Sequence, residues 1–153
     1  MSRRYALLLD AGFLKYRIGS AKVPMDGPAV EKFVEQVRKI PELADLILHR
    51  VYFYDSRPLE GVAKNPFDGS TIDFGASQTA ARNKSMHSQL GRAPFFSMRF
   101  GELHQSGWEL KKKSLTKANK GKQASFGATD LQPSIHQKGV DMRIGLDDLR
   151  RIV

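Results

Sequence analysis

Acidic residues gather at two places in the chain where they could hold a metal ion. Asp10 ends the apolar run of residues 5–9, and Asp141, Asp147 and Asp148 fall within eight residues of one another. Carboxylate oxygens are the ligands that hard divalent cations such as Mg²⁺ and Mn²⁺ prefer. These aspartates are therefore candidates for a metal-dependent site, with helix capping as the simpler alternative for Asp10 and Asp141.

The spacing of the later aspartates leaves two pairings open. At about 100° per residue, Asp141 and Asp148 lie about 20° apart around a helix, whereas Asp141 and Asp147 lie about 120° apart. Helical geometry alone thus favours Asp148 as the partner of Asp141.

A basic segment is the second feature with chemical meaning. From residue 111 to residue 122 the chain carries six lysines and no acid, against a formal net charge of +9 for the whole sequence. Lysines that neutralise phosphates release counterions and give salt-sensitive binding to nucleic acid, although such blocks are also common in solvated loops. The candidate nucleic-acid-binding residues are Lys111, Lys112, Lys113, Lys117, Lys120 and Lys122.

Several function classes are disfavoured by what the sequence lacks. It has no cysteine, which excludes disulfides, cysteine-ligated zinc, iron–sulfur clusters and thiol nucleophiles. It has neither standard glycine-rich phosphate loop and no nucleophile elbow, which disfavours hydride transfer, P-loop chemistry and serine hydrolysis. No apolar run is long enough for a signal peptide or a transmembrane helix, so we expect a soluble cytoplasmic protein.

The elements that must position these residues alternate between strands and helices. Residues 5–9, 46–54 and 95–100 are apolar runs typical of buried strands. Apolar residues at helical spacing from Val30 to Ile40, with Pro28 in the first turn, predict a helix between the first two strands. A strand, a helix and a strand in this order predict an α/β fold with a parallel sheet.

The remaining segments give weaker patterns. Residues 114–134 follow no clear pattern. We expect a long loop over 56–76, a polar helix over 77–90, a β-hairpin over 101–112 that turns at 106–107, and a last helix over 140–152.

The other titratable residues have ordinary explanations. Asp55 begins the turn-like sequence Asp-Ser-Arg-Pro, so we expect it to hold a turn. The four histidines, His49, His87, His104 and His136, show no metal-ligand spacing and are expected to be ordinary strand or surface residues.

Taken together, these pieces resemble the NYN domains, which are relatives of the PIN-like nucleases. The resemblance lies in ALLLDAGFL around Asp10, in RVYFYDS, in SMRFGELHQSGWELKKK and above all in QKGVDMRIGLD, from Gln137 to Asp147. It extends over residues 4–147 in order and spacing. It implies a Rossmann-like three-layer sandwich whose parallel central sheet has the strand order 3-2-1-4-5.

The resemblance also implies an activity and a site. NYN domains collect acidic residues at the carboxyl ends of strands 1 and 4 and in the helix between them, bind Mg²⁺ or Mn²⁺, and hydrolyse RNA phosphodiesters. Asp10 matches the acid of the first strand, Asp141 the acid of the KGVD motif and Asp147 the acid of the GLD element. These three are the predicted catalytic and metal-binding residues, and Asp148 is the second choice.

Two departures from the family pattern affect this interpretation. Phe13 occupies a position where many members carry Asn, and the chain ends at Val153, before the expected fourth strand and its acids. We therefore expect a single domain over residues 1–153 that lacks its last strands and contains a basic loop over 111–134. The first strand would then be an exposed sheet edge, open to a homodimer partner or a complementing chain.

Three hypotheses follow. The first is a metal-dependent ribonuclease, whose activity the missing strand would reduce or abolish. The second is a catalytically silent module that binds RNA or a protein partner, and the third is a fragment that does not fold stably alone.

Overall fold

The computed structural model describes residues 3–118 and 124–149. Its strands are β1 (Arg4–Asp10), β2 (Ile47–Ser56), β3 (Val62–Lys64), β4 (Thr71–Asp73), β5 (Phe96–Leu110) and β6 (Leu131–Lys138). Its helices are α1 (Ala11–Ile18), α2 (Gly27–Arg38), α3 (Gln78–Leu90), α4 (Lys112–Ala118) and α5 (Val140–Leu149), with short 3-10 turns η1 (Pro41–Leu43) and η2 (Ala128–Asp130).

A mostly parallel sheet of four strands forms the centre of the molecule, which confirms the predicted α/β class. Its order is β1-β2-β5-β6, with β1, β2 and β5 parallel and β6 antiparallel to β5. Among the described strands, β1 pairs with β2 alone and is therefore a sheet edge.

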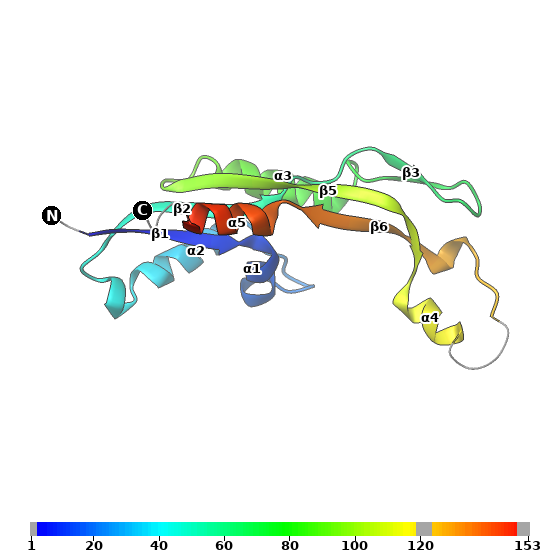
Figure 1. Ribbon diagram of the computed structural model, residues 1–153, viewed down its shortest axis with the longest axis horizontal. Coiled ribbons are helices and arrows are strands. Elements are labelled where there is room, and N and C mark those ends of the chain that lie inside the picture. Colours follow the sequence, from blue (N-terminus) through cyan, green and yellow to red (C-terminus); the bar gives the residue numbers. More distant parts are fainter. Residues whose placement is uncertain (1–2, 119–123, 150–153) are drawn as a thin grey trace.

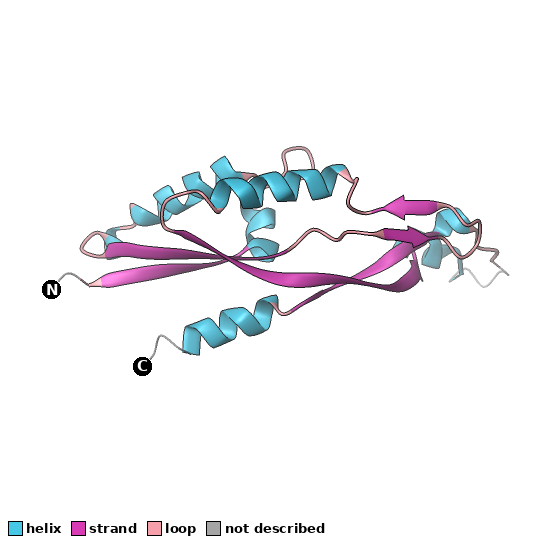
Figure 2. Cartoon of the chain, turned by 90° about the horizontal axis from the view of Figure 1, so that it is seen from above, coloured by secondary structure: helices cyan, strands magenta, loops and turns pink. Residues whose placement is uncertain are grey.

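Helices cover the sheet on both faces, in three layers (Figure 2). Helices α2 and α3 lie on one face and α5 lies on the other. Under α2 and α3, the core is built from Val30, Phe53 and Leu90, each with no exposed surface. Helix α2 begins as the sequence predicts, since the Asp26 carboxylate accepts a hydrogen bond from the Ala29 amide at 2.9 Å and Pro28 lies in the first turn.

Strand β5 pairs with two different strands, and the position that we predicted for the hairpin turn is wrong. Residues 96–101 pair with β2, and residues 102–110 pair with β6. The expected turn at 106–107 is instead a bulge, where Gly107 adopts φ +103° and the register with β6 shifts. The chain turns back only beyond Leu110, through α4 and η2, so part of the expected basic loop is helix and strand.

A small antiparallel arm occupies much of the predicted long loop. In this arm β3 and β4 are antiparallel, with Val62 opposite Asp73 and Lys64 opposite Thr71. The Asn65 side-chain amide donates to the Ala128 carbonyl at 3.1 Å, which ties this arm to η2. Figure 1 shows the arm and α4 at one end of the molecule, away from α1. In the described part of the chain, no helix is both long and apolar enough to cross a membrane.

Candidate functional site

Asp10 lies at the carboxyl end of β1, as the sequence predicts. It pairs with Tyr54 of β2, so Asp55 comes one residue further along the neighbouring strand. The Asp10 Oδ1 atom accepts a hydrogen bond from the Gly12 amide at 2.8 Å and thereby caps α1. Asp10 is therefore a helix cap, as the simpler alternative predicted, and its Oδ2 atom takes no part in this cap.

Asp141 lies in the first turn of α5 and is exposed. Leu7 and Leu9 pack into the core under α2, so strand alternation assigns Asp10 to the opposite face, which carries α5. The side chains of Asp147 and Asp148 lie outside the described part of the chain. Among side chains that are described, no three metal-ligating residues form a group. The predicted set of Asp10, Asp141 and Asp147 includes one side chain outside that search and stays a prediction.

Of the predicted phosphate-binding lysines, Lys111, Lys112 and Lys113 lie at the far end of the β5–β6 ladder. Lys112 and Lys113 are exposed in the first turn of α4, whereas the Lys111 Nζ atom donates to the Thr129 carbonyl at 2.7 Å. The side chain of Lys117, and all of Lys120 and Lys122, fall outside the described residues. Leu110 lies seven residue steps along β5 from Leu103 at the carboxyl edge, which is about 23 Å at about 3.3 Å per step.

An acid on the same ladder stays ionised near these lysines. Hydrogen bonds from Gln132 and then from Ser134 hold the pKa of the Glu109 carboxyl below its ordinary value. The charge near the ladder end is therefore mixed: Lys112 and Lys113 are exposed, and the Lys112 charge also interacts with the Glu109 carboxylate.

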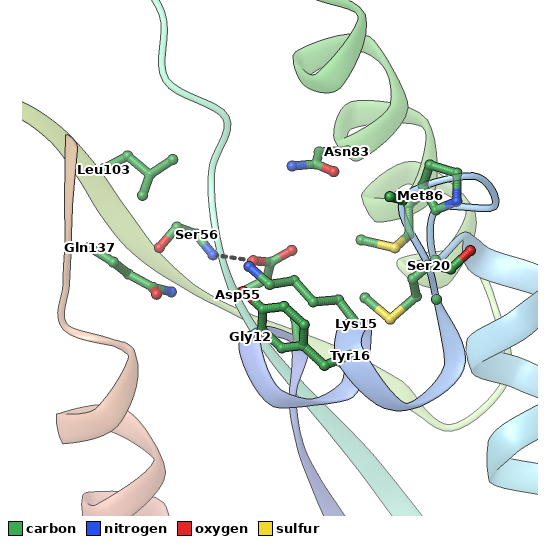
Figure 3. A pocket seen from close by; sticks show the side chains of 15 residues that line it. Gly12, Lys15, Tyr16, Ser20, Asp55, Ser56, Asn83, Met86, Leu103 and Gln137 are labelled. Carbon is green, nitrogen blue, oxygen red and sulfur yellow. Dashed lines mark hydrogen bonds between the residues drawn. The ribbon is translucent and has the colours of Figure 1, made fainter. Parts of the chain in front are cut away.

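A pocket of about 530 Å³ opens at the carboxyl ends of the parallel strands. In open α/β sheets, this edge is where ligands bind. Figure 3 shows Asn83 and Met86 of α3 on one side of the pocket, Leu103 of β5 and Gln137 of β6 on the other, and Lys15 of α1 between them. The first turn of α1, which Asp10 caps, also contributes to the wall.

An aspartate–histidine pair borders this pocket, and the sequence interpretation missed it. The His87 Nε2 atom of α3 lies 2.7 Å from the Asp55 Oδ2 atom of β2, and the two side chains are only 9% and 19% exposed. The Asp55 Oδ1 atom accepts from the Ser56 amide, and the His87 ring contacts Phe100 with centroids 4.9 Å apart. Asp55 therefore holds more than the turn that the sequence indicates.

Ser56 carries a buried hydroxyl without a partner. The residue is 4% exposed and lines the pocket, and its Oγ atom is the one buried side-chain polar atom without a hydrogen bond among the described residues. An unsatisfied buried hydroxyl typically costs about 1–3 kcal/mol. Such an atom in a pocket wall marks a place where a polar ligand group would be stabilised.

No protein family, curated protein or solved structure matches the chain. Function must therefore be inferred from the residues and their arrangement.

Proposed function

We propose that the chain is an NYN-type, PIN-like domain that binds RNA and hydrolyses its phosphodiester bonds at the carboxyl edge of the sheet. The observation that carries this proposal is the strand order. Read from β5, the parallel strands run β5-β2-β1, which is third, second and first among the large strands. This order would match the first three positions of the 3-2-1-4-5 order that the resemblance implies. Asp10 at the end of β1 supports the same interpretation, and α5 lies on the face of the sheet opposite to α2 and α3.

The proposed cofactor is Mg²⁺ or Mn²⁺. Asp10 and Asp141 would hold it, because their carboxylate oxygens suit a hard cation in kind. Two carboxylates do not make a group of three ligands, and the described side chains supply no third one. Asp147 is therefore proposed as the third ligand. When bound, such an ion polarises a phosphate and lowers the pKa of a coordinated water. The Gly12 amide holds the Oδ1 atom of Asp10 in place, and the Oδ2 atom would then be the one that binds the ion.

The proposed setting is the cytoplasm, where a cysteine-free chain loses nothing to the reducing environment. The direct test of the reaction is cleavage of end-labelled single-stranded RNA by the purified chain in Mn²⁺ and in EDTA. Products that need Mn²⁺ would support hydrolysis. Equal products in EDTA, or none in Mn²⁺, would count against it.

A second candidate is a catalytically silent RNA-binding module. It is favoured by the use of Asp10 as a helix cap and by the exposure of Lys112 and Lys113. In this case the chain would bind RNA without cutting it, and affinity would come from phosphate neutralisation by lysines.

Both candidates predict that Lys112 and Lys113 bind RNA phosphates. Changing both to Ala should weaken binding and make the logarithmic salt dependence shallower by about 1.4, at about 0.7 per phosphate contact on single strands. Fluorescence anisotropy with a labelled RNA at several salt concentrations measures both quantities. The control changes Lys32 and Lys39, two exposed lysines at α2, to Ala. An unchanged slope in the α4 variant would exclude α4 from the RNA interface.

The edge strand β1 is a further part of the proposal. Unpaired backbone groups along an apolar edge invite another strand, so we propose that a second copy or a separate chain pairs with β1. Sedimentation velocity over a concentration series should show a discrete dimer that forms reversibly. A single species of monomer mass at all concentrations would contradict self-pairing.

A further inference from the structure

The wall of the carboxyl-edge pocket combines an exposed aromatic ring with a cation. Tyr16 of α1 is 79% exposed, and the Lys15 Nζ atom lies 5.0 Å from the centre of its ring. Among the described residues, Lys15 has no carboxylate partner within ion-pair distance. Because the Lys15 ammonium lies over one face of the Tyr16 ring, the other face suits a base that stacks, and the ammonium suits the phosphate of the same nucleotide.

The remaining polar groups of the pocket can read a base edge. Asn83 and Gln137 each carry an amide that both donates and accepts, and they come from opposite sides of the opening in Figure 3. Ser56 adds the buried hydroxyl that lacks a partner. Single-stranded RNA is recognised in this way, with an unstacked base held on an aromatic ring and hydrogen-bonded along its edges.

From this arrangement we infer that the pocket binds one unstacked nucleotide of a single-stranded RNA, with the base stacked on Tyr16 and the phosphate at Lys15. The volume of about 530 Å³ lies within the range of about 300–1,000 Å³ that is common for small-molecule sites. The inference rests on the proposed function for its choice of RNA as the source of the nucleotide. It adds a base-binding site that is separate from the lysines of α4.

The test uses a single nucleotide, 2-aminopurine riboside 5′-monophosphate, whose fluorescence is quenched when the base stacks. We expect the wild-type chain to quench it in a saturable way, without RNA or added metal. Tyr16→Ala should weaken this binding about tenfold, since a stacked base depends on the ring. Ser56→Ala should weaken it about fivefold, the usual effect of one hydrogen bond, without lowering the midpoint of urea unfolding.

Phe13→Ala is the matched control, because Phe13 is another exposed aromatic residue of α1 that has a cation, Arg17, 5.0 Å from its ring centre. Phe13 is not part of the pocket wall, so its loss should leave nucleotide binding unchanged. Quenching that never saturates, or equal losses in Phe13→Ala and Tyr16→Ala, would overturn the inference.

The outcome is independent of the cleavage assay. Nucleotide binding through Tyr16 in a chain that neither binds nor cuts RNA would support a nucleotide site in the pocket, but it would overturn both the proposed function and RNA as the source of the nucleotide. If the chain cleaved RNA but the Tyr16 and Ser56 variants bound the nucleotide as well as the wild type, the proposed function would be supported and the inference about the pocket would be overturned.

Discussion

Asp10→Asn and Asp141→Asn are each expected to reduce Mn²⁺-dependent RNA cleavage by at least about 100-fold, because loss of an outer-shell partner alone costs about 10–100-fold at metal sites. Each change removes a negative charge and a strong oxygen donor from the proposed metal site. RNA affinity should remain within about twofold, since phosphate contacts by lysines supply it. Gel assays of end-labelled RNA measure cleavage, and anisotropy measures affinity.

The Asp10→Asn variant should change the proposed metal site while keeping the cap of α1. An Asn side chain also caps helices, so its oxygen can still accept the hydrogen bond from the Gly12 amide. Asp26→Asn is the matched control, because Asp26 caps α2 through the Ala29 amide in the same way. It should cleave at the wild-type rate. If Asp10→Asn cleaved as fast as Asp26→Asn, Asp10 would be a cap only and the silent RNA-binding module would be favoured.

Sequence patterns predicted the strands and helices that show a clear hydrophobic or helical pattern within their own segment. Strands β1, β2 and the first part of β5 follow from apolar runs, and α2 and α3 follow from helical spacing or a polar helical composition. Helix α1 was missed because Phe13 and Tyr16 are exposed, so its outward face looks apolar and the helical pattern is obscured. The β3–β4 arm was also missed, since three-residue strands leave almost no alternation to detect.

The site was less predictable because it depends on tertiary contacts. Asp55 and His87 are 32 residues apart, and they meet only because α3 packs over β5 with the His87 ring against Phe100. Each residue alone has an ordinary explanation, and the one available signal was an aspartate at a strand end. Asp10 could be placed from sequence, since it ends an apolar run and is the last residue of β1, whereas its role as a cap required the geometry of the Gly12 amide.

Gly101 is the position where β5 changes partners, and Gly101→Ala should be strongly disruptive. Ser56 of β2 is its parallel partner, and the next residue, Glu102, pairs with Lys138 of β6. An added Cβ atom would lie 2.6 Å from the Lys138 carbonyl oxygen and 2.6 Å from the Val140 Cγ2 atom. The carbonyl belongs to the β6 backbone and cannot turn away as a flexible side chain would.

The expected cost of Gly101→Ala is about 3 kcal/mol, the upper part of the usual range for overpacking, because backbone must move. The shift would displace the start of α5, where Val140 is 2% exposed and Asp141 follows it. We therefore expect lower stability in urea unfolding, together with a loss of Mn²⁺-dependent cleavage that persists at temperatures where the variant is folded.

Gly145→Ala provides the comparison within α5 itself. Its Cβ atom would meet nothing within 4 Å, and replacing a mid-helix glycine by alanine stabilises a helix by about 1 kcal/mol. Stability should therefore rise in this variant and fall in Gly101→Ala, although the chemical change is identical. If both variants were equally stable, α5 would not be packed against β5 at Gly101 in solution. The placement of Asp141 on the face of the sheet that Asp10 occupies would then lose its structural support.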